Sequence, residues 1–264
     1  KPGAVQGNGQ LVLKRVIGAA AGIEYFRRER NLPAEAVLSD GNGLFPDRVS
    51  PDEFAARVIQ IVRSEGDEGL RRINTALDGG SPDILEVTQS EIDSAFDELD
   101  PAAVSALELA ADRVRKFQGR GLPKSWSDGT GKFGEKVTPL ETIAAYVPGG
   151  TAPLASTVIM TVVPAKVAGV DEIIVATPTP GNALPHPAIL AAAKIAGADR
   201  VFKLGGAQAI AALAYGTESV PAVDLICGPG NGWVTAAKKL VFGDVGIDGL
   251  YGPTETLVIA DESA

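Results

Sequence analysis

The stretch Arg200-Val-Phe-Lys-Leu-Gly-Gly-Ala-Gln-Ala-Ile-Ala-Ala-Leu-Ala-Tyr215 contains the pattern that decides the fold. A short apolar run, Arg200 to Leu204, is followed by two glycines and then by an apolar segment of helical length, Gln208 to Tyr215. This pattern predicts a strand, a tight turn and a helix. Repeated units of this kind indicate a parallel sheet, because parallel strands need a long crossover connection.

The same alternation extends on both sides of this stretch. The sequence predicts further strands near residues 143–147, 172–176, 223–227 and 256–260, and further helices near residues 155–170, 187–196 and 231–242. The predicted strands are short and almost wholly apolar, which is typical of a sheet that is covered on both faces. The expected fold class is therefore α/β, with a parallel sheet.

A helical region precedes the predicted sheet. Capping boxes begin at Ser50 and at Thr88, and Asp100-Pro101 has the signature of a third helix start. Apolar residues follow each start at helical spacing, as far as Phe117. Residues 50–118 are therefore predicted to form helices with one buried stripe each.

These patterns suggest how the chain is organised. Residues 119–134 are rich in glycine and polar residues, and we interpret them as a connection. We expect an N-terminal arm and helix in residues 1–49, the latter near 19–31. We also expect a helical region with the start of the first α/β domain in residues 50–145. Residues 146–264 are predicted to be a nucleotide-binding-type α/β domain, truncated at its C-terminal end.

Composition excludes several classes of protein. The 264 residues have a formal net charge of -9 and a pI of about 4.8, which disfavours binding to nucleic acid. The most apolar stretch, residues 154–170, is interrupted by polar residues and a proline, so no membrane span is predicted. The one cysteine, Cys227, rules out an internal disulfide and fits a reducing, cytoplasmic location.

Four glycine-rich clusters are candidate functional segments. They are Tyr146-Val-Pro-Gly-Gly150, Gly205-Gly-Ala-Gln-Ala209, Gly228-Pro-Gly-Asn231 and Gly252-Pro-Thr-Glu255. The first three each lie between a predicted strand and a predicted helix, at the sheet edge where ligands bind in open α/β sheets. Glycines often serve only a turn, but three such turns with polar side chains favour a small-molecule site. None has the spacing of a dinucleotide fingerprint or of a P-loop.

Long segments around these clusters resemble the histidinol dehydrogenase family. They are residues 146–160, 205–218, 228–231 and 252–261, and the whole resemblance covers about residues 50–264. The resemblance implies an architecture similar to that of aldehyde dehydrogenases, with incomplete Rossmann-type domains. It also implies a homodimer that uses NAD and zinc to oxidise an amino alcohol, L-histidinol, through an aldehyde to L-histidine in histidine biosynthesis.

The resemblance also implies roles for particular residues. Tyr146, Gln208 and Asn231 would contact NAD, and Thr254 would contact the substrate. The family's zinc ligands and its Glu-His acid/base pair belong to Q-A-E-H and G-P-E-H motifs, which do not occur in this sequence. Catalytic and metal-binding residues are therefore expected downstream of Ala264.

Departures from the family pattern leave other functions open. Thr254 stands where the family has a serine, and Gln118 stands where it has a histidine. These differences leave room for a related dehydrogenase of another small alcohol, such as a sulfonated diol. The small number of histidines leaves room for a non-catalytic chain that only binds a nucleotide.

Four further side chains need an interpretation. His186, the only histidine, lies in a proline-rich loop and is interpreted as a surface residue. Cys227 would be the nucleophile of a zinc-free aldehyde dehydrogenase, a third hypothesis, but a lone cysteine is more often a small buried apolar residue. Lys238 and Lys239 are interpreted as a solvated helix face, although one of them could help to bind an anionic cofactor.

Overall fold

The computed structural model describes residues 39–149 and 153–250, which contain a parallel five-stranded sheet. The strand order is β5-β4-β3-β6-β7. The strands are β3 (Thr142–Tyr146), β4 (Glu172–Thr177), β5 (Arg200–Lys203), β6 (Leu225–Cys227) and β7 (Gly246–Ile247). From β3 the chain adds β4 and β5 on one side of the sheet and then returns to add β6 and β7 on the other side. The boundary between β3 and β6 is therefore a topological switch point, as in a Rossmann fold. The predicted α/β class with an incomplete Rossmann-type sheet is confirmed.

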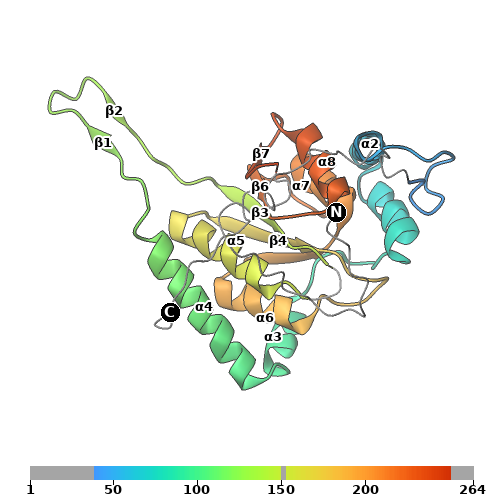
Figure 1. Ribbon diagram of the computed structural model, residues 1–264, viewed down its shortest axis with the longest axis horizontal. Helices are drawn as coiled ribbons and strands as arrows, with labels where there is room; N and C mark the ends of the chain where they lie inside the picture. Colours follow the sequence, from blue (N-terminus) through green and yellow to red (C-terminus); the bar gives the residue numbers. More distant parts are fainter. Residues whose placement is uncertain (1–38, 150–152, 251–264) are drawn as a thin grey trace, which may run out of the picture. The chain divides into compact units, whose positions relative to one another are not determined.

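Helices cover both faces of this sheet (Figure 1). They are α2 (Pro51–Asp78), α3 (Gln89–Asp97), α4 (Pro101–Gln118), α5 (Ala155–Ala168), α6 (Pro187–Ala196), α7 (Gly206–Tyr215) and α8 (Gly232–Val241). Helices α2, α7 and α8 pack together against one core, and α3 to α6 surround a second. Because strand residues alternate between faces, Ala144 and Tyr146 join the first core, whereas Ile143 and Ala145 join the second.

The predicted regions are connected through the sheet. The division expected between residues 145 and 146 falls inside β3, and α2 shares a core with β3 to β6. The domain limits themselves stay a prediction. The helix expected near residues 19–31, the strand expected near 256–260 and the substrate-contacting Thr254 lie outside the described residues.

The predicted helix starts are confirmed by their caps. The Thr88 side chain accepts the Glu91 N–H while Glu91 accepts the Thr88 N–H, which completes a capping box. Asp100 accepts the Ala102 N–H at 2.8 Å.

The stripe predicted for α4 faces the second core, but most of it is only partly buried: Ala111 is buried, and Leu107 and Val114 pack against the core while half-buried. The prediction is wrong at the end of the stripe, where Phe117 is 75% exposed. Helix α4 packs over α5 and α6, so it lies at the outside of this core.

Part of the predicted connection forms a hairpin that the sequence reasoning missed. Strands β1 (Trp126–Ser127) and β2 (Gly134–Glu135) pair antiparallel and extend away from α4 and β3 (Figure 1). The exposed rings of Trp126 and Phe133 meet edge to face, with centroids 6.2 Å apart. The short edge strand β7 was also not predicted.

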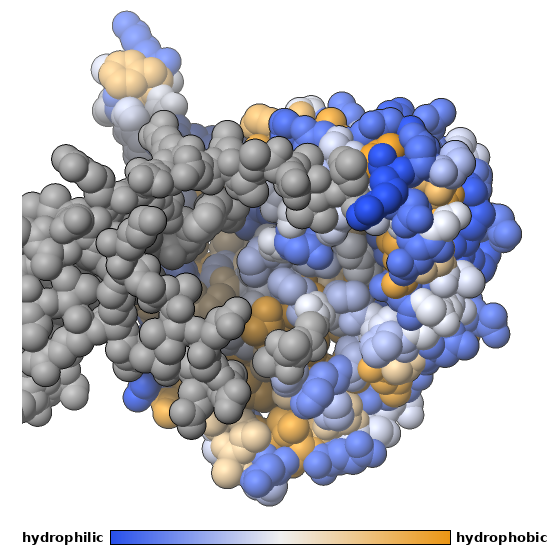
Figure 2. All heavy atoms as spheres, turned by 45° about the vertical axis from the view of Figure 1, so that its right-hand side comes forward, coloured by the Kyte–Doolittle hydropathy of each residue, from blue (hydrophilic) through white to orange (hydrophobic). Residues whose placement is uncertain are grey.

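On the face shown in Figure 2, hydrophilic side chains surround scattered apolar ones. Within residues 39–149 and 153–250, no helix combines the length and the apolar content needed to cross a bilayer.

Helix α2 bends at Gly66, and the bend is fixed by the loop that follows α7. Gly66 has φ 56° and ψ -133°, which is not helical. The Glu218 carboxylate accepts the Asp67 N–H at 2.7 Å and so caps the second half of α2. The Asp67 carboxylate in turn accepts the Thr217 hydroxyl proton at 2.6 Å. These contacts direct the last turns of α2 toward the carboxyl edge of the sheet.

Replacing Gly66 by alanine should therefore lower the free energy of unfolding. A Cβ at this position would lie 2.4 Å from Glu218 Oε2, in a backbone conformation that side chains rarely adopt. We expect Gly66→Ala to cost about 2–4 kcal/mol in urea denaturation. The matched control is Gly79→Ala at the end of the same helix, where a Cβ meets nothing within 4 Å. Gly79→Ala should lower the free energy of unfolding by only about 1 kcal/mol. If both variants lower it equally, the capping role of Glu218 is contradicted.

Candidate functional site

The turns that follow β3 and β6 approach each other closely at the carboxyl edge of the sheet. Gly228 has φ 109°, and a Cβ on it would lie 2.1 Å from the Tyr146 carbonyl oxygen. A second close approach brings Gly205, after β5, against Pro178, after β4, where a Cβ would lie 2.2 Å from the proline ring. Glycine is thus required because the neighbouring backbone leaves no room for a side chain. The turns form one continuous rim.

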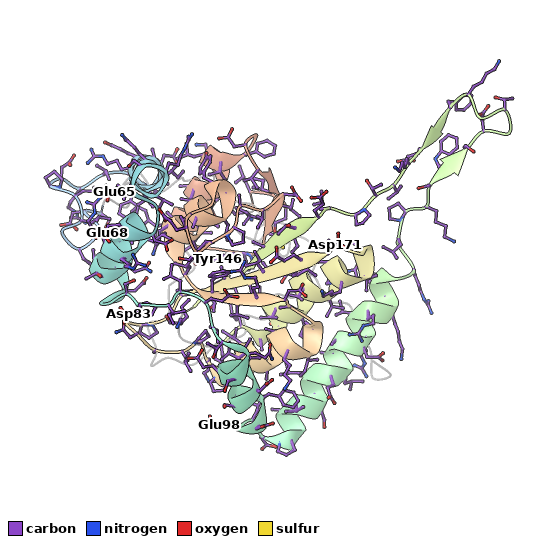
Figure 3. The ribbon with its side chains drawn as sticks, turned by 180° about the vertical axis from the view of Figure 1, so that it is seen from behind. Glu65, Glu68, Asp83, Glu98, Tyr146 and Asp171 are labelled. Carbon is purple, nitrogen blue, oxygen red and sulfur yellow. The ribbon has the colours of Figure 1, made fainter. Side chains whose placement is uncertain are left out.

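This rim encloses a cavity of about 350 Å³. The three predicted cofactor-binding residues, Tyr146, Gln208 and Asn231, all line it. They come from the end of β3, where Figure 3 shows Tyr146, from the first turn of α7 and from the N-cap of α8. The other lining residues are Ser39, Phe54, Leu77, Asp78, Pro148, Gly149, Pro178, Gly206, Ala207 and Trp233. The structure therefore brings the predicted site residues together, while their binding to NAD stays a prediction.

Tyr146 is held as a hydrogen-bond donor. The Gly206 N–H donates to the Tyr146 phenol oxygen at 3.1 Å, which leaves the O–H proton for a second partner. Burial raises the pKa of the Tyr146 phenol above its ordinary value, and the negative charge of Asp78 raises it further. The phenol consequently stays protonated at neutral pH.

Gln208 lines the cavity and is held by polar residues of α2. Its side chain is 1% exposed, and its Nε2 donates to Asn74 Oδ1 at 3.2 Å and lies 3.4 Å from Asp78 Oδ2. These contacts fix the amide orientation. Gln208 Oε1 is buried and has no hydrogen-bond partner within the described ranges. Leaving a buried acceptor without a partner costs about 1–3 kcal/mol.

Asn231 and an aromatic pair complete the opposite wall. Asn231 Oδ1 accepts the Trp233 and Val234 N–H groups at 3.1 Å and so caps α8, which leaves the Nδ2 amide as a donor. The rings of Phe54 and Trp233 lie 4.8 Å apart, centroid to centroid. A flat heterocyclic ligand could pack against them.

The ends of three helices polarise the cavity. Helix α2 ends at Asp78, whereas α7 begins at Gly206 and α8 begins at Gly232. Helix N-termini favour negative charge and C-termini disfavour it. A phosphate group is therefore favoured near α7 and α8, and a neutral group with hydrogen-bond donors is favoured near Asp78.

Sequence reasoning missed Asn74, Asp78 and Phe54. A signal was present for the first two, because Asn74 and Asp78 are four residues apart on the helix face that also carries Leu70, Ile73 and Leu77. Polar residues at buried helical positions point to a hydrogen-bond network. The sequence alone did not reveal that Gln208 was their partner.

The interpretation of Lys238 as a solvated residue is wrong. Lys238 is 3% exposed, and its ammonium forms an ion pair with Asp248 and donates to the Gly228 carbonyl oxygen at 3.0 Å. Asp248 also accepts the Gly228 N–H at 2.8 Å. The reason is periodicity, since Lys238 lies one turn after the buried Val234. The pair fixes the turn that carries Asn231, whereas Lys239 is exposed as expected.

The remaining candidate side chains lie outside this cavity. His186 is exposed, as predicted, and its Nδ1 caps α6 by accepting the Ala188 N–H at 3.1 Å. Cys227 lines a separate, mainly apolar cavity of about 680 Å³ between α5 and the base of the hairpin. Burial raises the pKa of its thiol to about 12, so the thiolate required by the zinc-free hypothesis is scarce. No three His, Cys, Asp or Glu side chains form a metal site in the part of the chain that the structure describes.

Fold and cavity together define a Rossmann-like α/β protein with a cavity at the carboxyl edge of its sheet, beside the topological switch point. The family model of histidinol dehydrogenase matches residues 48–264, and the chain belongs to this family. It is 48% identical to histidinol dehydrogenase from Deinococcus radiodurans over 252 residues, covering 94% of this chain and 57% of that protein.

Two further relatives agree. The chain is 52% identical to histidinol dehydrogenase from Thermus thermophilus over 215 residues, covering 81% of this chain and 51% of that protein. The crystal structure of histidinol dehydrogenase from Elizabethkingia anophelis matches with a TM-score of 0.74 and 31% identity, over 83% of this chain and 53% of that one. The chain thus spans about half the length of these relatives.

Removing the buried ammonium of Lys238 should destabilise the turn at Gly228. We expect Lys238→Met to lower the free energy of unfolding by about 2–4 kcal/mol, because Asp248 would keep a partly buried charge without its ion-pair partner. The neighbouring Lys239→Met is the control, since Lys239 pairs with Asp52 at the surface, and it should change stability by less than about 1 kcal/mol. Chemical denaturation of both variants measures the difference, and similar stabilities would show that the buried pair does not hold the turn.

Proposed function

We propose that this chain forms the NAD-binding part of a histidinol dehydrogenase, which oxidises L-histidinol to L-histidine in two steps through an aldehyde. The observation that carries the proposal is the convergence of Tyr146, Gln208 and Asn231 on one cavity, with Gln208 Oε1 buried and unpaired among the described residues. Family membership supports the choice of substrate. When bound, NAD supplies the acceptor for the hydride that leaves the substrate in each step.

The polar groups of the cavity fit a nucleotide cofactor. The Tyr146 O–H and the Asn231 Nδ2 can donate, while Gln208 Oε1 and the Asp78 carboxylate can accept. A nucleotide contains carbonyl and phosphate acceptors as well as hydroxyl and amino donors, so it can satisfy both sets. The apolar wall at Phe54 and Trp233 can exclude water from one face of a bound ring. A volume of about 350 Å³ lies within the range of small-molecule pockets.

Other parts of the proposal rest on the family alone. Zinc binding, a homodimeric assembly, a cytoplasmic location and substrate contact by Thr254 are expected on this basis. The described residues do not offer a set of side chains that fits zinc.

One alternative is favoured by a specific observation. The sole histidine, His186, caps α6 and lies outside the cavity, which fits a chain that binds a nucleotide without performing oxidation. An assay of the full-length gene product with NAD, zinc and L-histidinol separates these two functions. Alcohol-dependent formation of NADH supports the dehydrogenase, and saturable NAD binding without turnover supports the binding protein. Turnover of a sulfonated diol in place of L-histidinol would support the related dehydrogenase.

Removing the phenol oxygen of Tyr146 should weaken NAD binding. Tyr146→Phe deletes a hydroxyl that lies in the cavity, and we expect the dissociation constant to rise roughly 2- to 10-fold, the equivalent of one hydrogen bond. Trp233 lines the same cavity, so tryptophan fluorescence can report the titration.

The control is Tyr215→Phe, which deletes a hydroxyl that donates to Asp244 at 2.7 Å, away from the cavity. Its affinity for NAD should equal that of the unmodified chain. Absence of saturable NAD binding by the unmodified chain would overturn the proposed function.

A further inference from the structure

Asp78 places a charge in a cavity whose other polar side chains, among the described residues, are neutral. Among the described residues that line the cavity, Asp78 alone has a formal charge, and neither Lys nor Arg faces it there. Its carboxylate lies at the C-terminus of α2, where the helix dipole adds further negative potential. Burial raises the pKa of Asp78 to about 6, so the carboxyl group is ionised at neutral pH at a free-energy cost.

The Asp78 carboxylate makes only a weak contact with its neighbour Gln208, so it can still accept hydrogen bonds from a ligand. Its contact with Gln208 Nε2 is long, at 3.4 Å, and the same Nε2 makes its shorter hydrogen bond to Asn74. A carboxylate at this position can accept two hydrogen bonds from adjacent hydroxyl groups. It also repels a phosphate, because both the side chain and the helix end are negative.

We propose that Asp78 accepts hydrogen bonds from ribose hydroxyl groups of the cofactor, and that it makes this cavity prefer NAD to the 2′-phosphorylated NADP. This inference rests on the proposed function. Acidic residues at the switch point of nucleotide-binding sheets can bind ribose hydroxyls in this way, usually from the end of a strand. Here the carboxylate comes from the C-terminus of a helix that precedes the sheet in the chain.

The test compares Asp78→Asn with the unmodified chain in calorimetric titrations with NAD and with NADP. Asparagine keeps the size of the side chain and removes its charge. We expect NAD affinity to fall about tenfold, the loss of one charged hydrogen bond. We also expect the affinity for NADP to rise. The ratio of the NADP dissociation constant to the NAD dissociation constant should therefore fall at least about tenfold.

The matched control is Asp83→Asn. Asp83 is exposed, and Figure 3 shows it at the outer side of the molecule, away from Tyr146. This variant has the same change in net charge, so any general electrostatic effect would appear in it too. Both affinities should match those of the unmodified chain.

A pH series gives an independent readout that does not need a variant. The ionised carboxylate is the better acceptor, so NAD affinity should fall as the pH is lowered through about 6 and Asp78 becomes protonated. Asp78→Asn should show no such loss in this range.

The outcomes distinguish this inference from the proposed function. If the unmodified chain does not bind NAD, the proposed function fails, and this inference fails with it. If the unmodified chain binds NAD with an affinity that is independent of pH near 6, or if Asp78→Asn keeps its preference for NAD over NADP, only the role of Asp78 is overturned. Loss of affinity for L-histidinol alone in Asp78→Asn would also overturn it, because the carboxylate would then bind the substrate's ammonium group.

Discussion

The candidate site depends on the contact between the backbone of Gly228 and that of Tyr146. No side chain fits between these two turns, because a Cβ on Gly228 would lie 2.1 Å from the Tyr146 carbonyl oxygen. The contact joins the strands on either side of the topological switch point, β3 and β6. The buried Lys238–Asp248 pair holds the Gly228 turn from its other side through the amide and carbonyl groups of the glycine. Asn231 and Tyr146 consequently face one cavity.

Hydrogen bonds between the lining residues determine which polar groups are free to bond a ligand. Tyr146 accepts from the Gly206 amide, and Gln208 donates to Asn74, so each is fixed in orientation by a neighbour. The fixed groups leave the Tyr146 phenol proton free to bond a ligand, and they leave Gln208 Oε1 without a hydrogen-bond partner among the described residues. The bend of α2 at Gly66 is part of this arrangement, since it directs the last turns of the helix, with Asn74 and Asp78, toward the start of α7. A distant loop, at Thr217 to Ser219, thereby contributes to the site through α2.

Local patterns predicted most of the fold, and long-range contacts account for much of what they missed. The helix caps at Thr88 and Asp100 involve residues that are close in sequence, and so do the apolar strands. The sequence alone therefore predicts them. The three turns were placed correctly because parallel strands bring their carboxyl ends to one edge. The hairpin at residues 126–135 was missed although its strands are close in sequence, because each strand has only two residues and both are exposed. The burial of Lys238 was missed because its ion-pair partner, Asp248, lies beyond the end of α8, although the spacing from Val234 placed Lys238 on the buried face. Asn74 and Asp78 were missed because Gln208 lies more than a hundred residues away in sequence.

Amide hydrogen exchange with and without NAD tests the central claim most directly. The claim is that three turns from separate parts of the chain form one nucleotide site. It predicts that NAD slows exchange at residues 146–149, 205–209 and 228–231 together, and leaves the hairpin at residues 126–135 unchanged. Protection at one turn alone, or protection confined to the apolar cavity between α5 and the hairpin, would contradict it.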